Sequence, residues 1–135
     1  MSATLRIATA VKTVRATALW QRLNGGSILL YAGSVPADAD TAITDQTLLA
    51  TFDALNTPAG SVTDGVFTLD TTGGIITLAV TTATATFARA LDSTSGVIAD
   101  MDVGESGSGA LLIIDDAAIV TGMLVSITSL VVTEG

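Results

Sequence analysis

The N-terminal 24 residues carry a helical pattern of apolar positions. Ile7, Val11, Val14 and Ala18 recur at three- and four-residue spacing, which places their side chains on one face of an α-helix. Asn24-Gly25-Gly26 ends the pattern, because glycine adopts the left-handed conformation that follows helices without steric cost. The pattern predicts a helix over residues 4 to 24 that docks through this stripe. Leu5, Leu19, Trp20 and Leu23 would form a second apolar face that contacts something else.

After Gly26 the apolar pattern changes to short runs and to alternation with a period of two, which is typical of β-strands. Turn residues such as Gly, Pro, Asn and Asp separate these runs. The predicted strands cover residues 27–32, 48–55, 66–70, 75–80, 82–91, 97–103, 110–114, 119–120 and 123–133. We expect residues 82–91 and 97–103 to pair as neighbours around a loop at 92–96.

About seven to nine short strands at regular spacing are typical of a sandwich or a barrel. We therefore expect a mostly β protein, with an N-terminal α-helix followed by an antiparallel β-sandwich of the jelly-roll or immunoglobulin-like type. A length of 135 residues fits one domain. Within it, residues 1–26 would be a helical docking segment and residues 27–135 the β-sandwich.

The amino-acid composition bears on whether the chain is a subunit of an assembly. Nearly half of the residues are hydrophobic, only 13% are charged, and the mean hydropathy is +0.66. Average globular proteins have about a quarter charged residues. A compact β domain with few charges is one interpretation. The other is a subunit whose surface is covered by neighbours, since large exposed apolar patches usually mark interfaces.

Charge is unevenly distributed along the chain. Four of the five basic residues lie in the first 22 positions, and no acid occurs before Asp38. The rest of the chain is acidic, which does not suit a phosphate backbone, so we expect no nucleic-acid partner. The basic segment would instead meet a protein partner or an acidic face of its own chain. The predicted partner-contacting residues are Arg6, Lys12, Arg15, Leu19, Trp20 and Arg22.

The chain has few candidate residues for catalysis or metal binding. The chain has no His and no Cys, which removes the usual catalytic bases, thiol nucleophiles and zinc ligands. Asp100, Asp102 and Glu105 are weak candidates for a calcium site, but the segment lacks further ligands at the expected spacing. We predict no catalytic residue, no cofactor and no metal, and therefore no enzyme.

Membrane insertion is not expected either. The apolar stretches are interrupted well before the ~20 residues that a transmembrane helix needs. Arg6, Lys12 and Arg15 would break the apolar core of a signal peptide.

Several short segments, in a fixed order, resemble a family of small structural proteins of tailed bacteriophages and prophages. They are Tyr31-Ala32-Gly33-Ser34-Val35-Pro36-Ala37, Leu48-Leu49-Ala50-Thr51, Ala85–Ser93 and Val125-Ser126-Ile127-Thr128-Ser129-Leu130. The likeness covers most of the chain, and its order matters more than any single motif. Similar proteins often have a Trp just before the position of Phe87, where this chain has none.

The resemblance implies a virion protein, made in the host bacterial cytoplasm, that works without catalysis. A capsid decoration or cement subunit is the first expectation, with the major capsid protein or another virion protein as partner and a homo-oligomer, trimer or dimer, as the assembly. A tail-associated subunit of the tube, tip or fibre is the alternative. A receptor-binding or carbohydrate-binding β module is the second. The resemblance carries no defined functional residue.

Overall fold

The computed structural model describes residues 8–53, 55, 59–72 and 74–133. A helix, α1 (Thr9–Trp20), continues into one 3₁₀ turn, η1 (Gln21–Leu23). Gly25 then adopts a φ of 67°, as expected for the residue that ends a helix. The helix is therefore present, and its first predicted residues, 4 to 7, lie outside the described part of the chain.

Eleven strands follow in the described residues, which makes the protein mostly β, as predicted. They are β1 (Ser27–Ala32), β2 (Thr47–Phe52), β3 (Gly60–Thr63), β4 (Val66–Leu69), β5 (Ile75–Leu78), β6 (Ala83–Thr84), β7 (Phe87–Leu91), β8 (Val97–Gly104), β9 (Leu112–Ile114), β10 (Ala118–Ile119) and β11 (Leu124–Thr133). Strand β3 was not predicted, and the predicted strand 82–91 is divided into β6 and β7.

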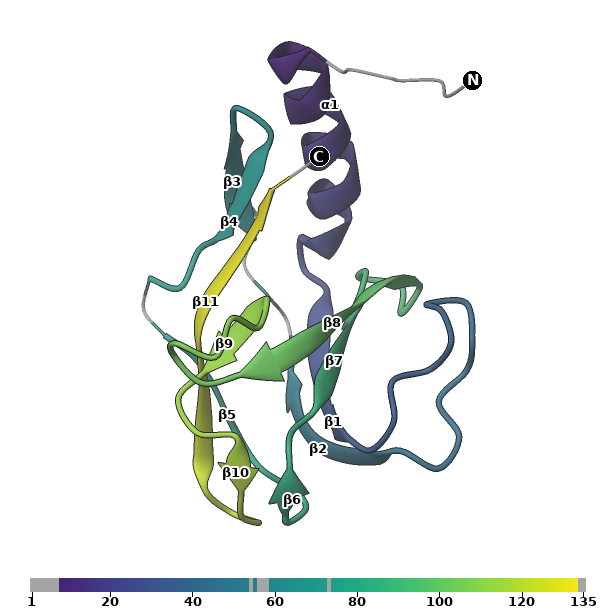
Figure 1. The fold of residues 1–135 in the computed structure, drawn as a ribbon, viewed down its shortest axis with the longest axis vertical. Helices are drawn as coiled ribbons and strands as arrows, with labels where there is room; N and C mark the ends of the chain where they lie inside the picture. Colours follow the sequence, from purple (N-terminus) through teal and green to yellow (C-terminus); the bar gives the residue numbers. More distant parts are fainter. Residues whose placement is uncertain (1–7, 54, 56–58, 73, 134–135) are drawn as a thin grey trace, which may run out of the picture.

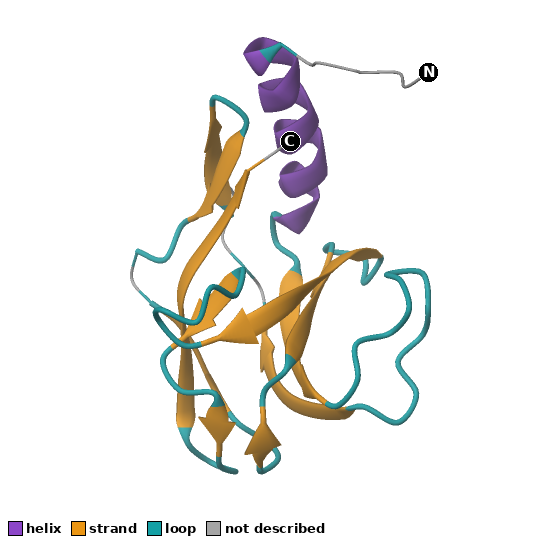
Figure 2. Ribbon diagram, in the orientation of Figure 1, coloured by secondary structure: helices purple, strands orange, loops and turns teal. Residues whose placement is uncertain are grey.

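The strands form one large curled sheet and one small ribbon (Figures 1 and 2). The large sheet runs in the order β2-β1-β7-β8-β9-β11-β4-β3, with β5 also paired to β11; β6 and β10 form the ribbon. Curling brings β5 close to β2, where the Val80 amide donates to the Leu49 carbonyl at 2.8 Å. The sheet is therefore a half-barrel, and the expected sandwich is not confirmed.

The pairing is mixed. Strands β8 and β9 run parallel, whereas the other paired strands are antiparallel. The expectation of a purely antiparallel sheet is therefore wrong. The physical reason is the loop at 105–111, which carries the chain across so that β9 enters the sheet in the direction of β8.

The core fills the inside of the curl and extends beneath the helix. Ile28 and Leu30 of β1, Phe52 of β2, and Val125 and Ile127 of β11 are buried side chains of this core. Ala16, Trp20 and Leu23 from the helical segment belong to the same cluster. Burial of these side chains therefore holds the helix to the β body, at roughly 1.5–3 kcal/mol for a large aliphatic residue.

Candidate functional site

The helix docks through a different face from the one predicted. Ala16, Trp20 and Leu23 are buried, whereas Val11 and Val14 are 49% and 67% exposed. The Trp20 ring stacks on Phe67 of β4, with ring centroids 4.8 Å apart. The predicted docking stripe is therefore wrong, and Trp20 is a core residue rather than a partner contact.

The turn between β3 and β4 fixes the position of the helix. Gly65 has a φ of 77° and donates its amide to the Thr13 hydroxyl at 2.9 Å. A Cβ at Gly65 would lie 2.8 Å from the Lys12 Cβ, so the helix can approach only because the residue is glycine. The tip of the β3–β4 hairpin thus supports one side of α1 and leaves the opposite side uncovered by the described chain.

We call that uncovered side the helix face; it consists of Val11, Val14, Ala18 and Leu19. Leu19 is 37% exposed and lies at the margin of this face. Arg15 is exposed one helical turn after Val11, whereas Lys12 is half-buried at the Gly65 turn. The helix face is therefore mainly aliphatic, with cationic side chains near it.

The other predicted basic contacts have separate locations. Arg22 donates to Asp92 in the β7–β8 loop at 2.8 Å, so part of the basic segment meets an acid of its own chain. This ion pair and hydrogen bonds from Thr94 and Gly96 lower the pKa of Asp92 far below its ordinary value. Arg6 lies outside the described residues. Arg15 and Leu19 border the helix face, Lys12 lies against the Gly65 turn, and Trp20 and Arg22 lie elsewhere.

A second exposed aliphatic surface was not predicted; we call it the sheet patch. Leu78 of β5 and Leu124 of β11 are paired across the two strands and are 57% and 61% exposed. Ile76, Val80 and Val120, each more than half exposed, continue the patch along β5 and into the 120–123 turn. In Figure 1 this region lies at the lower end of the molecule and the helix at the upper end.

The curl of the sheet explains why sequence alternation did not reveal this patch. Val125 and Ile127 of β11 face the core, whereas Leu124 faces solvent. A register shift between Ile127 and Ser129 then returns Leu130 to the core. Both faces of β11 thus carry large aliphatic residues. Which face is covered depends on the segments that pack against the strand, and the sequence of β11 alone does not show this.

The buried ion pair of the sheet was also not predicted. Arg89 of β7 is 4% exposed, and its guanidinium donates to both carboxylate oxygens of Asp100 on β8, at 2.7 and 2.9 Å. The hydrogen bonds to Asp100 raise the pKa of Arg89, and burial raises the pKa of the neighbouring Tyr31. Tyr31 stacks on Phe87 at a centroid distance of 5.2 Å. The cluster holds the outer face of β1, β7 and β8 together.

The three weak metal candidates do not converge. Asp100 is held by Arg89, Asp102 accepts from the Leu111 amide at 2.9 Å, and Glu105 accepts from the Ala117 amide at 3.0 Å. Within residues 8–53, 55, 59–72 and 74–133, no group of three acidic side chains could hold a metal ion. Asp100 instead joins β8 to β7, and Asp102 and Glu105 fix the β8–β9 connection and its neighbouring loop.

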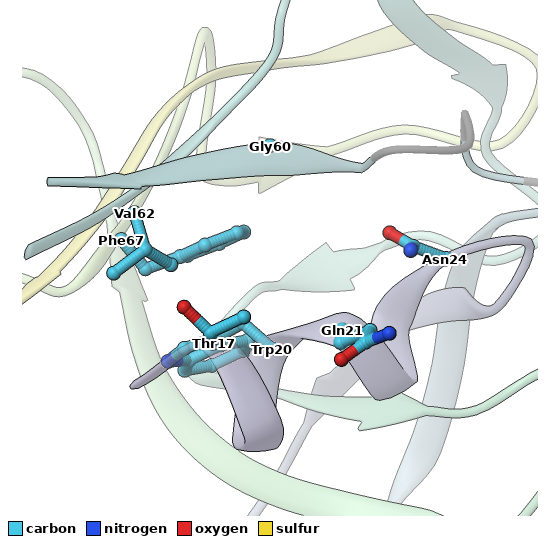
Figure 3. A pocket seen from close by; sticks show the side chains of 7 residues that line it. All are labelled: Thr17, Trp20, Gln21, Asn24, Gly60, Val62 and Phe67. Carbon is cyan, nitrogen blue, oxygen red and sulfur yellow. The ribbon is translucent and has the colours of Figure 1, made fainter. Parts of the chain in front are cut away.

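A groove of about 280 Å³ lies between the helix and the edge strand β3 (Figure 3). Phe67 and Val62 line one wall, and Thr17, Trp20 and Gln21 line the other. Asn24 and Gly60 complete the lining, and the Asn24 side chain accepts from the Ala59 amide at 2.7 Å. The lining has hydroxyl, amide and apolar side chains without an ionisable group, so it offers no acid or base for catalysis.

None of the helices in the described residues has the length and hydropathy needed to cross a membrane. Comparison of the chain with protein-family models, with curated proteins and with solved structures found no match.

Proposed function

We propose that this chain is a non-catalytic structural subunit of a bacteriophage virion, and that it decorates and cements the assembled head. The observation that carries the proposal is the presence of two exposed aliphatic surfaces, the helix face and the sheet patch, at opposite ends of the molecule. A subunit that bridges neighbours needs two such surfaces. The resemblance of the sequence to small virion proteins is the reason for proposing a virion as the assembly.

The helix face is the surface that we assign to the capsid shell. Val11 and Val14 supply apolar contact area with Leu19 at its margin, and Lys12 supplies positive charge beside the hairpin tip for an acidic surface of the major capsid protein. A protein that binds only the assembled shell stabilises that shell by mass action. The acidic β body, which makes the net charge −8, would then face outward.

Chemistry supports the non-catalytic part of the proposal. The chain has neither His nor Cys, and Arg89 is held in a buried ion pair. Lys12, the single lysine, lies half-buried against the Gly65 turn. Arg89 therefore has a structural role, and the stem of Lys12 packs against the hairpin turn.

Two other functions compete. A tail-associated subunit would use the same two surfaces at a lower copy number. A receptor- or carbohydrate-binding module would need exposed aromatic side chains or a metal, but Trp20, Tyr31, Phe52, Phe67 and Phe87 are all buried. Thermal unfolding with added Ca²⁺ or simple sugars distinguishes this last function, since a binding module would be stabilised by its ligand.

A single substitution on the helix face tests the proposal directly. Purified protein is mixed with heads that lack it, and co-sedimentation is measured for the wild type, Val14→Glu and Val35→Glu. Val35 is a matched control, because it is 52% exposed and lies in the β1–β2 loop. We expect Val14→Glu to weaken binding at least tenfold and Val35→Glu to bind normally. Equal binding by all three proteins would contradict the assignment of the helix face.

Deletion of the whole N-terminal segment would be a poorer test. It would remove Trp20 and Leu23 from the core as well as Val11 and Val14 from the surface. Loss of binding would then report unfolding and contact loss together.

A further inference from the structure

The sheet patch is built from two hydrogen-bonded strands rather than from scattered side chains. Leu78 and Leu124 are direct cross-strand partners, and Ile76 pairs with Ser126 on the same outward face. The inward partners, Val125 with Thr77 and Ile127 with Ile75, fill the core. Because both strands are fixed by this inward packing, the outward aliphatic side chains form a preorganised surface. Isolated exposed aliphatic residues are common, but a contiguous group indicates a contact.

Charge is absent from the chain segments that build this end of the molecule. Residues 71–88 and 117–133 contain no Asp, Glu, Lys or Arg, although the whole chain has a net charge of −8. Two acids lie at the margin: Asp53 lines a groove with Ile76, and Asp115 accepts from the Ser126 amide. Two copies of so acidic a protein repel each other over most of their surface. They can approach most closely at this uncharged end.

The surroundings of the patch have the anatomy of a protein interface. Hydroxyl groups of Thr82 and Thr121 hydrogen-bond to each other at 3.1 Å beside Val80 and Val120. Stable interfaces have an apolar centre without charges and a polar rim, and they bury roughly 800 Å² on each partner. The aliphatic side chains would supply the centre and the threonines the rim.

We propose that the sheet patch packs against the sheet patch of a second copy of this chain, with Leu78 and Leu124 at the centre of the contact. A contact of one surface with itself is closed by a two-fold axis, so the product is a dimer. The helix face is a poorer partner for the patch, because the Lys12 charge near it would meet no opposite charge there. The proposal goes beyond the capsid contact: the helix faces of a dimer would remain free to reach two neighbouring subunits.

Sedimentation of the purified full-length protein tests the dimer without any virus particle. At about 100 μM, where a micromolar contact is saturated, we expect the wild type to sediment as a dimer. Leu124→Asp should raise the dimer dissociation constant at least tenfold, because it places two carboxylates at the centre of the contact. Val14→Asp, an equally exposed aliphatic site on the helix face, should remain dimeric. A monomeric wild type, or a Leu124→Asp variant that dimerises normally, would overturn the proposal.

Cysteine cross-linking provides a second measurement that does not depend on a destabilising charge. The chain has no Cys, so each introduced thiol is unique. Oxidation of Leu124→Cys should give a covalent dimer, and oxidation of Val35→Cys should leave a monomer on a denaturing gel. Equal cross-linking of both variants, or none in Leu124→Cys, would contradict a contact centred on Leu124. Failure of either test leaves the virion proposal intact, and loss of head binding leaves the dimer intact.

Discussion

Arg89 is the one charged residue that is less than a tenth exposed in the part of the chain that the structure describes, and the side chain of its partner Asp100 is 10% exposed. Both guanidinium bonds to the carboxylate are short, at 2.7 and 2.9 Å. Removing water from two charges costs free energy, which good geometry offsets but seldom exceeds. The pair therefore contributes less to stability when intact than either charge costs when left alone.

Removing one charge of the pair, or both together, tests this asymmetry. Arg89→Met leaves Asp100 buried without a counter-ion and should lower the unfolding free energy by about 3–5 kcal/mol. Arg89→Met with Asp100→Leu removes both charges and should recover most of that loss. Urea unfolding measures each variant. If Arg89→Met alone costs less than about 1 kcal/mol, the pair behaves as a surface ion pair and the interpretation is wrong.

Asp92 differs from this buried pair, because it is a carboxylate at the surface that accepts several hydrogen bonds. Arg22, Thr94 and Gly96 all donate to it and lower its folded pKa. A folded pKa below the unfolded value, which is about 3.9, gives stability that is present above that pH and lost as pH falls further. The hairpin loop and the helical segment should therefore loosen together in acid.

The pH dependence of unfolding checks this behaviour in Asp92→Asn. The variant should have a lower urea midpoint than the wild type at pH 7, and the two midpoints should converge as the pH falls below about 4. Asp40→Asn, an exposed loop carboxylate, serves as the control for the change in net charge. A constant difference between wild type and Asp92→Asn from pH 7 down to acid would contradict a lowered folded pKa.

At the scale of elements, the helix shows what periodicity can and cannot predict. The stop at Asn24-Gly25-Gly26 was predicted correctly because it depends on local backbone conformation. The docking face was predicted wrongly because α1 has apolar residues on two sides. Near its centre the exposed side carries the larger residues, Val11 and Val14, whereas the buried side carries Ala16. The deciding contacts are the Trp20–Phe67 stack and the Gly65 turn, which come from distant parts of the chain.

Substitutions on the two sides of α1 should separate surface from core. Val14→Glu replaces an exposed side chain and should change the unfolding free energy by no more than about 0.5 kcal/mol. Ala16→Glu places a charge at a position that is 1% exposed and should cost about 3 kcal/mol or more. The single Trp20 makes intrinsic fluorescence a direct report of helix docking in both variants. Equal costs at the two positions would show that the helix docks through another face.

At the scale of the whole molecule, strand existence was predictable and strand placement was not. The pairing of β7 with β8 follows from the loop between them. Counting outward from that loop sets Arg89 opposite Ala99, but a register shift next to Ala90 sets it opposite Asp100 instead. Bulges, the parallel β8–β9 pair and the curl toward β2 depend on packing between distant segments. The ion pair and the sheet patch depend on these features, so the sequence alone did not predict them.

The helix and the β5–β11 turn region lie at opposite ends of the long axis (Figure 1), and each carries exposed aliphatic side chains. This arrangement suits a subunit that contacts a sister copy at one end and the capsid shell at the other. A decoration protein of this kind should be present in many copies, because the contact sites repeat with the shell lattice.

The most direct test of the central proposal is copy number in purified virions, measured by quantitative mass spectrometry against the major capsid protein. We expect a ratio comparable to that of the capsid protein, as for a subunit that decorates the whole head. A much lower ratio would contradict decoration of the head and place the chain in the tail. Absence from the particles would contradict the virion proposal itself.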